Sequence, residues 1–226
     1  MPVSDLPPEI LDTIIDELQD DKNSLLQASL ACRAFYPRTR VYLFFFASLS
    51  ITSNCDRLRE LITLSPKLAL HFKYLKISLL CCPMTRPPDP VYRTLAVIES
   101  LVNVTHLSLC TGDWRYMPDS VVSSLQSHSY RSLEIGHHFR FRSIGEICSL
   151  LKNSPDLQQA HITCQTSIIT EGCNVDHSLH RSPVPVTVHI NDTQDYSKSA
   201  GTLDLIIRLM PIFLQQHTYT QYWLQG

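Results

Sequence analysis

The sequence predicts a mixed helix-and-strand fold, an α+β or α/β solenoid, with a three-helix module over residues 1–50 and an array over residues 51–226. Three observations support this prediction. Apolar residues before Thr52 recur at spacings of three and four, as on one face of a helix. After Thr52, helical segments alternate with short strands of the form L-x-L. These strands recur at similar separations, which indicates an internal repeat.

The first helix is expected to begin at Pro7 and Pro8, because proline fits a first turn, where its missing N–H costs little. Its apolar stripe consists of Ile10, Leu11, Ile14, Ile15 and Leu18.

The second helix is expected to begin with a capping box formed by Ser24 and Gln27. A third helix is expected from Pro37 through the segment PRTRVYLFFF. So small a module has a thin core, and it leaves Leu6, Ile10 and Phe35 as surplus apolar surface. Surplus apolar surface on a small helical module suggests a partner.

These helices resemble the F-box, a three-helix module that docks on the small adaptor subunit of cullin–RING ubiquitin ligases. The resemblance covers about residues 4–46, in a style similar to fungal F-box proteins. The matching positions are Leu6, Pro7, Glu9, Ile10, Leu11, Ile14, Ile15, Leu18, Leu25, Leu26, Ser29, Leu30, Arg33 and Phe35. The chain departs from the commonest F-box pattern at Ala31, where valine is usual, and at Phe35, where tryptophan is usual. Both residues are smaller, and the departures concern adaptor affinity rather than fold.

The resemblance implies a substrate-recognition subunit of an SCF-type ubiquitin ligase, which binds an unknown protein substrate through the repeat array. The residues expected to bind the adaptor are Leu6, Pro7, Ile10, Leu11, Ile14, Leu30 and Phe35. The alternative is a non-catalytic interaction or scaffold protein whose N-terminal helices only cap the array. That alternative expects Leu6 and Ile10 to be buried against residues after Thr52.

Each unit of the array is expected to consist of a helix, a short turn and a strand. The helices are expected in DRLRELITLSP, VYRTLAVIESLVN, DSVVSSLQSHS and SIGEICSLLKNSPDL. The inward strand residues Leu75, Leu107, Leu133 and Ala160 are separated by 32, 26 and 27 residues. The array resembles irregular leucine-rich repeats, whose usual length is about 20–29 residues, without their asparagine ladder. An ordinary α/β domain with a parallel sheet is the alternative, because alternation of helix and strand specifies either.

Beyond Gln165 the period is lost. Residues 165–200 are expected to be irregular and loop-rich, with one strand at 186–190, and an amphipathic helix is expected over 203–215.

The motifs predict no enzyme, no cofactor and no metal site. The sequence contains no nucleophile elbow, P-loop, dinucleotide-binding glycine motif or H-E-x-x-H. A hydrolase would need a cleft that joins Ser, His and Asp from different repeats. The best cysteine–histidine set lacks the close pairs of a zinc site and consists of Cys164, Cys173, His177 and His180. The segment GHHFRFR at 136–142 is expected to be a solvated loop; its Arg and Phe residues could also grip an acidic or nucleic-acid ligand.

Charge and cysteine content indicate the compartment. The net charge of −2 gives no general attraction to nucleic acid or anionic membranes. The eight cysteines form no C-x-x-C pair, which indicates buried thiols in a reducing compartment. The apolar run 41–51 is shorter than the about 20 residues of a membrane helix, and no secretory leader is expected. We therefore expect a cytoplasmic or nuclear protein without nucleic-acid or membrane partners.

Overall fold

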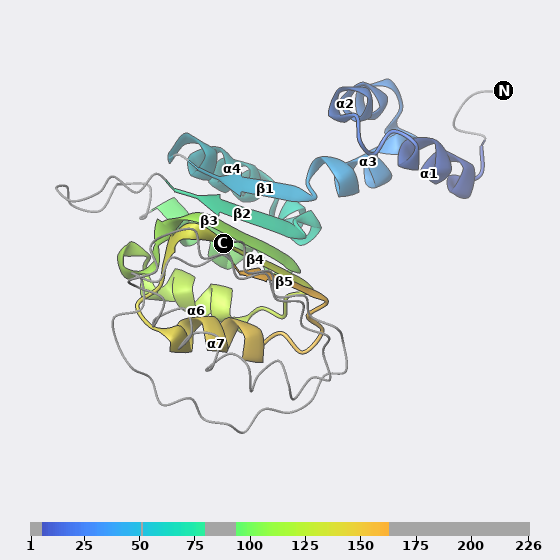
Figure 1. Cartoon of the computed structure of the whole chain (residues 1–226). Coiled ribbons are helices and arrows are strands. Elements are labelled where there is room, and N and C mark those ends of the chain that lie inside the picture. The colour runs from blue at the N-terminus through green and yellow to red at the C-terminus, as the bar shows by residue number, and fades with distance from the viewer. Residues whose placement is uncertain (1–5, 51, 80–93, 163–226) are drawn as a thin grey trace.

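The computed structural model describes residues 6–50, 52–79 and 94–162 (Figure 1). The first part, which we call the helical module, contains α1 (Pro8–Asp16), α2 (Lys22–Ala31), a 3₁₀ helix (Arg33–Phe35) and α3 (Tyr36–Leu43). The segments expected at 165–200, 186–190 and 203–215, and the cysteine–histidine set, lie outside the described residues.

A parallel sheet forms the second part. Its strands are β1 (Phe46–Leu49), β2 (Tyr74–Ser78), β3 (His106–Asp113), β4 (Ser132–Arg140) and β5 (Gln159–Ile162), side by side in that order. Between them lie α4 (Thr52–Leu64), the 3₁₀ helices Pro66–His71, Leu95–Ser100 and Trp114–Tyr116, α6 (Asp119–Ser127) and α7 (Ile144–Lys152). Figure 1 shows α6 and α7 together on one side of the sheet. The fold is thus mixed helix and sheet with parallel strands.

The strands share one register across the sheet. The direct partners in consecutive strands are Ala47, Leu75, Leu107, Leu133 and Ala160, each at most 5% exposed. The four anchor positions predicted from the repeat spacing are therefore confirmed as one buried row, and Ala47 extends it. A second buried row follows two residues later, since alternate residues of a strand point to the same face, and contains Leu49, Ile77, Leu109, Ile135 and Ile162.

The same backbone hydrogen bonds recur where each strand begins. The Phe45 carbonyl accepts from the N–H groups of Lys73 and Tyr74 at 2.9 and 3.0 Å. Equivalent pairs reach the carbonyls of Lys73, Thr105 and Arg131 from 105–106, 131–132 and 158–159. Each unit is therefore attached to the preceding one in the same way.

The pairing of β3 with β4 shifts register and then continues beyond the buried rows. The shift lies between Leu109 and Thr111, and a Cβ at Gly136 would come within 2.6 Å of the Cys110 carbonyl oxygen. Glycine permits this close approach. The expectation of a solvated loop at 136–142 was wrong: β4 continues to Arg140, and Phe141 is buried. In sequence, a glycine that admits a neighbouring strand resembles a glycine that makes a turn.

The boundary between the two parts also differs from the prediction. The third helix ends at Leu43, and residues 46–49, expected to close the module, pair with β2 as the first strand. The second helix is capped by Asp21, whose carboxylate accepts from the N–H groups of Asn23 and Ser24, instead of by the Ser24–Gln27 box. Within the segment expected to be a helix before β3, the described residues include the 3₁₀ helix Leu95–Ser100.

The helical module has a small core supported by one polar network. Its fully buried side chains include Ile15, Leu25 and Thr39. Arg38 donates to both carboxylate oxygens of Asp16, at 2.6 and 2.8 Å, and the Tyr42 hydroxyl donates to Asp16 at 2.8 Å. The bonds from Arg38, and then from Tyr42, lower the pKa of Asp16 below its ordinary value. The network joins the end of α1 to α3.

Truncation in the buried row is expected to weaken the whole sheet. Leu107→Ala removes a side chain that contacts the neighbouring units, and we expect it to lower the free energy of unfolding by about 2–5 kcal/mol. Urea denaturation measures the change. The matched control is Val102→Ala, at an exposed valine before the same strand, which should change stability by less than about 0.5 kcal/mol. Equal effects of the two substitutions would contradict the central position of this row.

The Asp16 network predicts a pH dependence. Because the folded-state pKa of Asp16 is lowered, its contribution is complete above the ordinary carboxyl pKa and is lost as pH falls through the lowered value. The stability difference between wild type and Asp16→Asn should therefore be largest near neutral pH and shrink in acid. Urea titrations across the pH range measure it, with Asp20→Asn, an exposed carboxylate in the next turn, as control. A difference that stays constant with pH would refute this account of the network.

Candidate functional site

The helical module exposes two apolar rows. On α1, Ile10 and Ile14 are one turn apart and 49% and 41% exposed. On α2, Leu26 and Leu30 have the same spacing and are 48% and 73% exposed. We call these four residues the apolar rows. Apolar side chains that gather on one exposed surface are typical of interaction sites, whereas single scattered ones are common on any protein.

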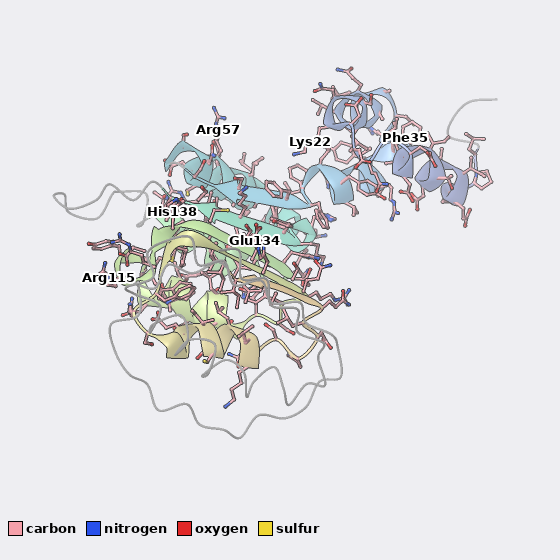
Figure 2. All side chains as sticks on the ribbon, in the orientation of Figure 1. Lys22, Phe35, Arg57, Arg115, Glu134 and His138 are labelled. Atoms are coloured by element: carbon pink, nitrogen blue, oxygen red, sulfur yellow. The ribbon has the colours of Figure 1, made fainter. Side chains whose placement is uncertain are left out.

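Phe35 lies between the helices that carry the rows. It is half-buried in the 3₁₀ helix Arg33–Phe35, which contacts both α1 and α2, and Figure 2 shows it within the module. Leu6 is half-buried and Pro7 is exposed at the start of α1. Six of the seven expected adaptor-binding residues thus keep some or most of their surface available to a partner.

Leu11 is the exception. It is buried in the module together with Ile15, so it contributes to folding and offers no surface to a partner. Leu11 is therefore the one expected adaptor-binding residue that the structure places in the core of the module. The apolar stripe of α1 is wider than the surface that the other helices of the module cover. Leu11 and Ile15 therefore lie in the core, while Ile10 and Ile14 on the same stripe stay exposed.

Sequence reasoning left two exposed apolar residues out of the expected site. Leu26 lies one turn before Leu30 on the same helix face, a spacing that could have identified it. Tyr36 begins α3 and is exposed, with the Arg40 guanidinium 4.1 Å from its ring centroid. Because Leu25 is buried and Leu26 exposed, the leucine pair alone did not reveal which residue faces outward.

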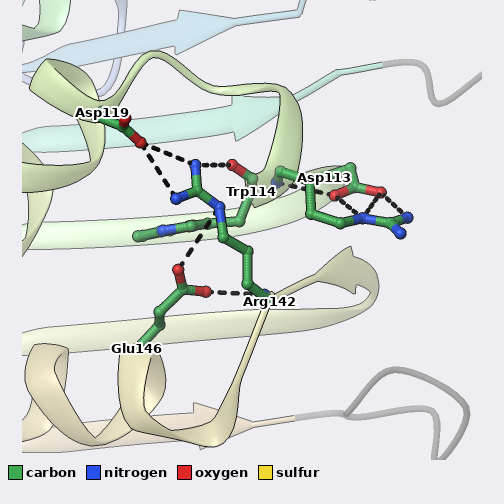
Figure 3. A network of polar contacts seen from close by, with 6 residues as sticks. Asp113, Trp114, Asp119, Arg142 and Glu146 are labelled. Carbon is green, nitrogen blue, oxygen red and sulfur yellow. Dashed lines mark hydrogen bonds and ion pairs between the residues drawn. The ribbon is translucent and has the colours of Figure 1, made fainter. Parts of the chain in front are cut away.

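Charged residues at the carboxyl end of the sheet form structural pairs. Figure 3 shows the Arg142 guanidinium between the carboxylates of Asp119, at 3.1 Å, and Glu146, at 3.9 Å. Arg142 also donates to the Trp114 carbonyl at 3.2 Å. Burial raises the pKa of Glu146. Each carboxylate faces the arginine, so the cluster joins α6 and α7 to the strand ends and does not have the geometry of a carboxylate acid–base pair.

A serine, a carboxylate and a histidine lie next to one another on the polar face of the sheet. Ser108, Glu134 and His161 are register partners across β3, β4 and β5. The Ser108 hydroxyl donates directly to Glu134 Oε2 at 2.6 Å. A serine nucleophile of the triad type instead bonds to an imidazole, which is in turn oriented by the acid. The order along this row is therefore not that of a triad.

The described part of the chain has neither a cluster of metal ligands nor a helix that could span a membrane. Within residues 6–50, 52–79 and 94–162, no three His, Cys, Asp or Glu side chains are grouped closely enough to hold a metal ion. Cys32, Cys55 and Cys110 form no disulfide, and burial raises the pKa of the Cys55 thiol. None of the helices in these ranges has the length and apolar character needed to cross a bilayer.

Comparisons with known proteins add no relative to this description. The chain matches no protein-family model, and no curated protein or solved structure is significantly similar to it.

Proposed function

We propose that this protein is a non-catalytic substrate-recognition subunit of an SCF-type cullin–RING ubiquitin ligase. Its helical module would dock on the small adaptor subunit of the ligase, and its sheet unit would bind a protein substrate. The observation that carries the proposal is the pair of exposed apolar rows, Ile10 with Ile14 and Leu26 with Leu30, on a module that resembles an F-box in sequence.

The exposure of the apolar rows favours docking over a capping role. If the module only capped the array, Ile10 would be buried against residues after Thr52, yet about half of its surface is exposed. The contacts between module and sheet unit come mainly from its other end: α3 contacts the 3₁₀ helix Pro66–His71, and Phe44 packs on Phe72 with ring centroids 6.1 Å apart. Those contacts are what the scaffold alternative has in its favour, and they leave α1 available to a partner.

We further propose that the sheet unit is a short, irregular leucine-rich-repeat-like solenoid. Three features support this: the sequential strand order, the single register, and the recurrent hydrogen bonds at the strand starts. Its order never reverses among the described strands, whereas a doubly wound α/β sheet reverses at the crevice where it binds ligands. The absence of a reversal favours binding of a protein on an extended surface.

No residue of this chain is assigned a chemical step in the proposal. A rigid connection between docking module and substrate-binding sheet would raise the effective concentration of a substrate lysine near the charged conjugating enzyme. The transfer chemistry belongs to the other subunits, and the proposed compartment is the cytoplasm or nucleus, where those ligases act.

Adaptor binding tests the proposal through the most exposed residue of each row. Ile10→Asp/Leu30→Asp would bury two unpaired carboxylates at the contact, so we expect at least about a tenfold loss of affinity. Pull-down of the purified adaptor by the full chain, followed by titration calorimetry, measures the loss.

Leu64→Asp is the matched control, because Leu64 is an exposed leucine at the end of α4, outside the helical module. This control should bind the adaptor like wild type. Equal binding by wild type and the double variant, or no binding by wild type, would exclude adaptor docking through these rows.

A further inference from the structure

A row of aromatic rings crosses the first three strands, on the face of the sheet opposite α6 and α7 (Figure 1). Phe46, Tyr74 and His106 are register partners at the starts of β1, β2 and β3. The Phe46 and Tyr74 ring centroids are 5.0 Å apart, and Tyr74 stacks on His106 at 6.1 Å. The residues that follow them, Ala47, Leu75 and Leu107, are buried, so the aromatic row points to the other face.

The aromatic row lies at the surface. Phe46 is 38% exposed, Tyr74 and His106 are half-buried, and none of the three belongs to the buried core of the sheet unit. Aromatic side chains are enriched where proteins bind other proteins, because they provide a large contact area at low conformational cost.

Two lysines flank the aromatic row. Lys22 Nζ of α2 lies 5.8 Å from the Phe46 ring centroid, and Figure 2 shows Lys22 on the side of the helical module that faces the sheet. Lys76 follows Tyr74 by two residues, so both point to the same face of β2. Neither lysine forms an ion pair with any residue of the described ranges.

The carboxylate of Glu134 lies on the same face of the sheet, farther from the helical module than the aromatic row. Glu134 is on β4, two strands from Lys76, and accepts the hydrogen bond from Ser108. The part of the face nearest the helical module is therefore aromatic and positively charged, although the whole chain has a net charge of −2.

We propose that the aromatic row, with Lys22 and Lys76, binds an acidic peptide segment that also carries aromatic or large apolar side chains. The rings would contact the apolar side chains, and the lysines would pair with the carboxylates. This inference rests on the proposed function, and it names the chemistry of the substrate segment that the sheet unit recognises. A peptide fits better than single-stranded nucleic acid, since nucleic-acid binding is typical of strongly basic domains, and this chain has 19 basic and 21 acidic residues.

Direct binding to the purified full chain tests the inference. The probe is a short fluorescein-labelled peptide of alternating glutamate and tyrosine, measured by fluorescence anisotropy. We expect Tyr74→Ala and Lys76→Gln each to weaken binding by about fivefold or more. Replacing the glutamates of the probe by glutamine should weaken binding similarly, and rising salt should weaken the acidic probe only.

The matched controls are Tyr36→Ala in the helical module and Lys152→Gln at the end of α7, both exposed and outside the aromatic row. Both should bind the probe like wild type. Equal losses in the control variants, equal affinity for the glutamine probe, or tighter binding of a single-stranded oligonucleotide would each overturn the inference. Lys76→Gln is a surface change of similar size, so its result does not depend on whether Tyr74→Ala weakens the fold.

The measurement also separates this inference from the proposed function. Peptide binding needs no adaptor, and the variants at Tyr74 and Lys76 should keep adaptor affinity, while Ile10→Asp should keep peptide affinity. If the peptide binds and the adaptor does not, the ligase proposal alone fails. If the adaptor binds and the peptide does not, the inference about the aromatic row alone fails.

Discussion

Each helix–strand unit of this protein has inward strand residues that the neighbouring units cover. The row from Ala47 to Ala160 meets that constraint by placing one apolar residue of every strand directly beside its neighbour. Cross-unit bonds reinforce the stacking: Asn103 donates to the Leu70 carbonyl at 3.0 Å, and Asn153 to the Gln126 carbonyl at 2.6 Å. The opposite face of the sheet carries aromatic and charged residues near the helical module, among them Phe46, Tyr74 and Lys76.

The helical module meets a different constraint, since three short helices cannot enclose a large core. Its buried residues are few, and the Arg38–Asp16–Tyr42 network supplies a directional connection where apolar contact is limited. The same shortage leaves Ile10 and Leu30 outside the core. A small core gives the helical module little stability alone, and it also leaves apolar side chains exposed. A docked partner would bury those side chains.

Much of the fold was predictable from periodicity, because burial on one face imposes a spacing that sequence retains. The anchors Leu75 to Ala160 are an example. Other features depend on tertiary contacts, which periodicity does not reveal. The segment FASL continues the apolar run of α3, and only pairing with β2 makes it a strand. Gly136 is typical of a turn in the sequence, but in the structure it lies in β4, where its missing side chain admits the Cys110 backbone. In the site, spacing placed Ile10 and Ile14 correctly outward but could not separate them from Leu11, since which edge of a stripe is covered depends on the neighbouring helices.

Hydrogen–deuterium exchange of the full chain, with and without the purified adaptor, tests the docking claim most directly. If the apolar rows are the docking surface, amides of α1 and α2 exchange more slowly in the presence of the adaptor, while those of β2 to β5 are unchanged. Unchanged exchange throughout the helical module at saturating adaptor, or protection confined to the sheet, would contradict the account.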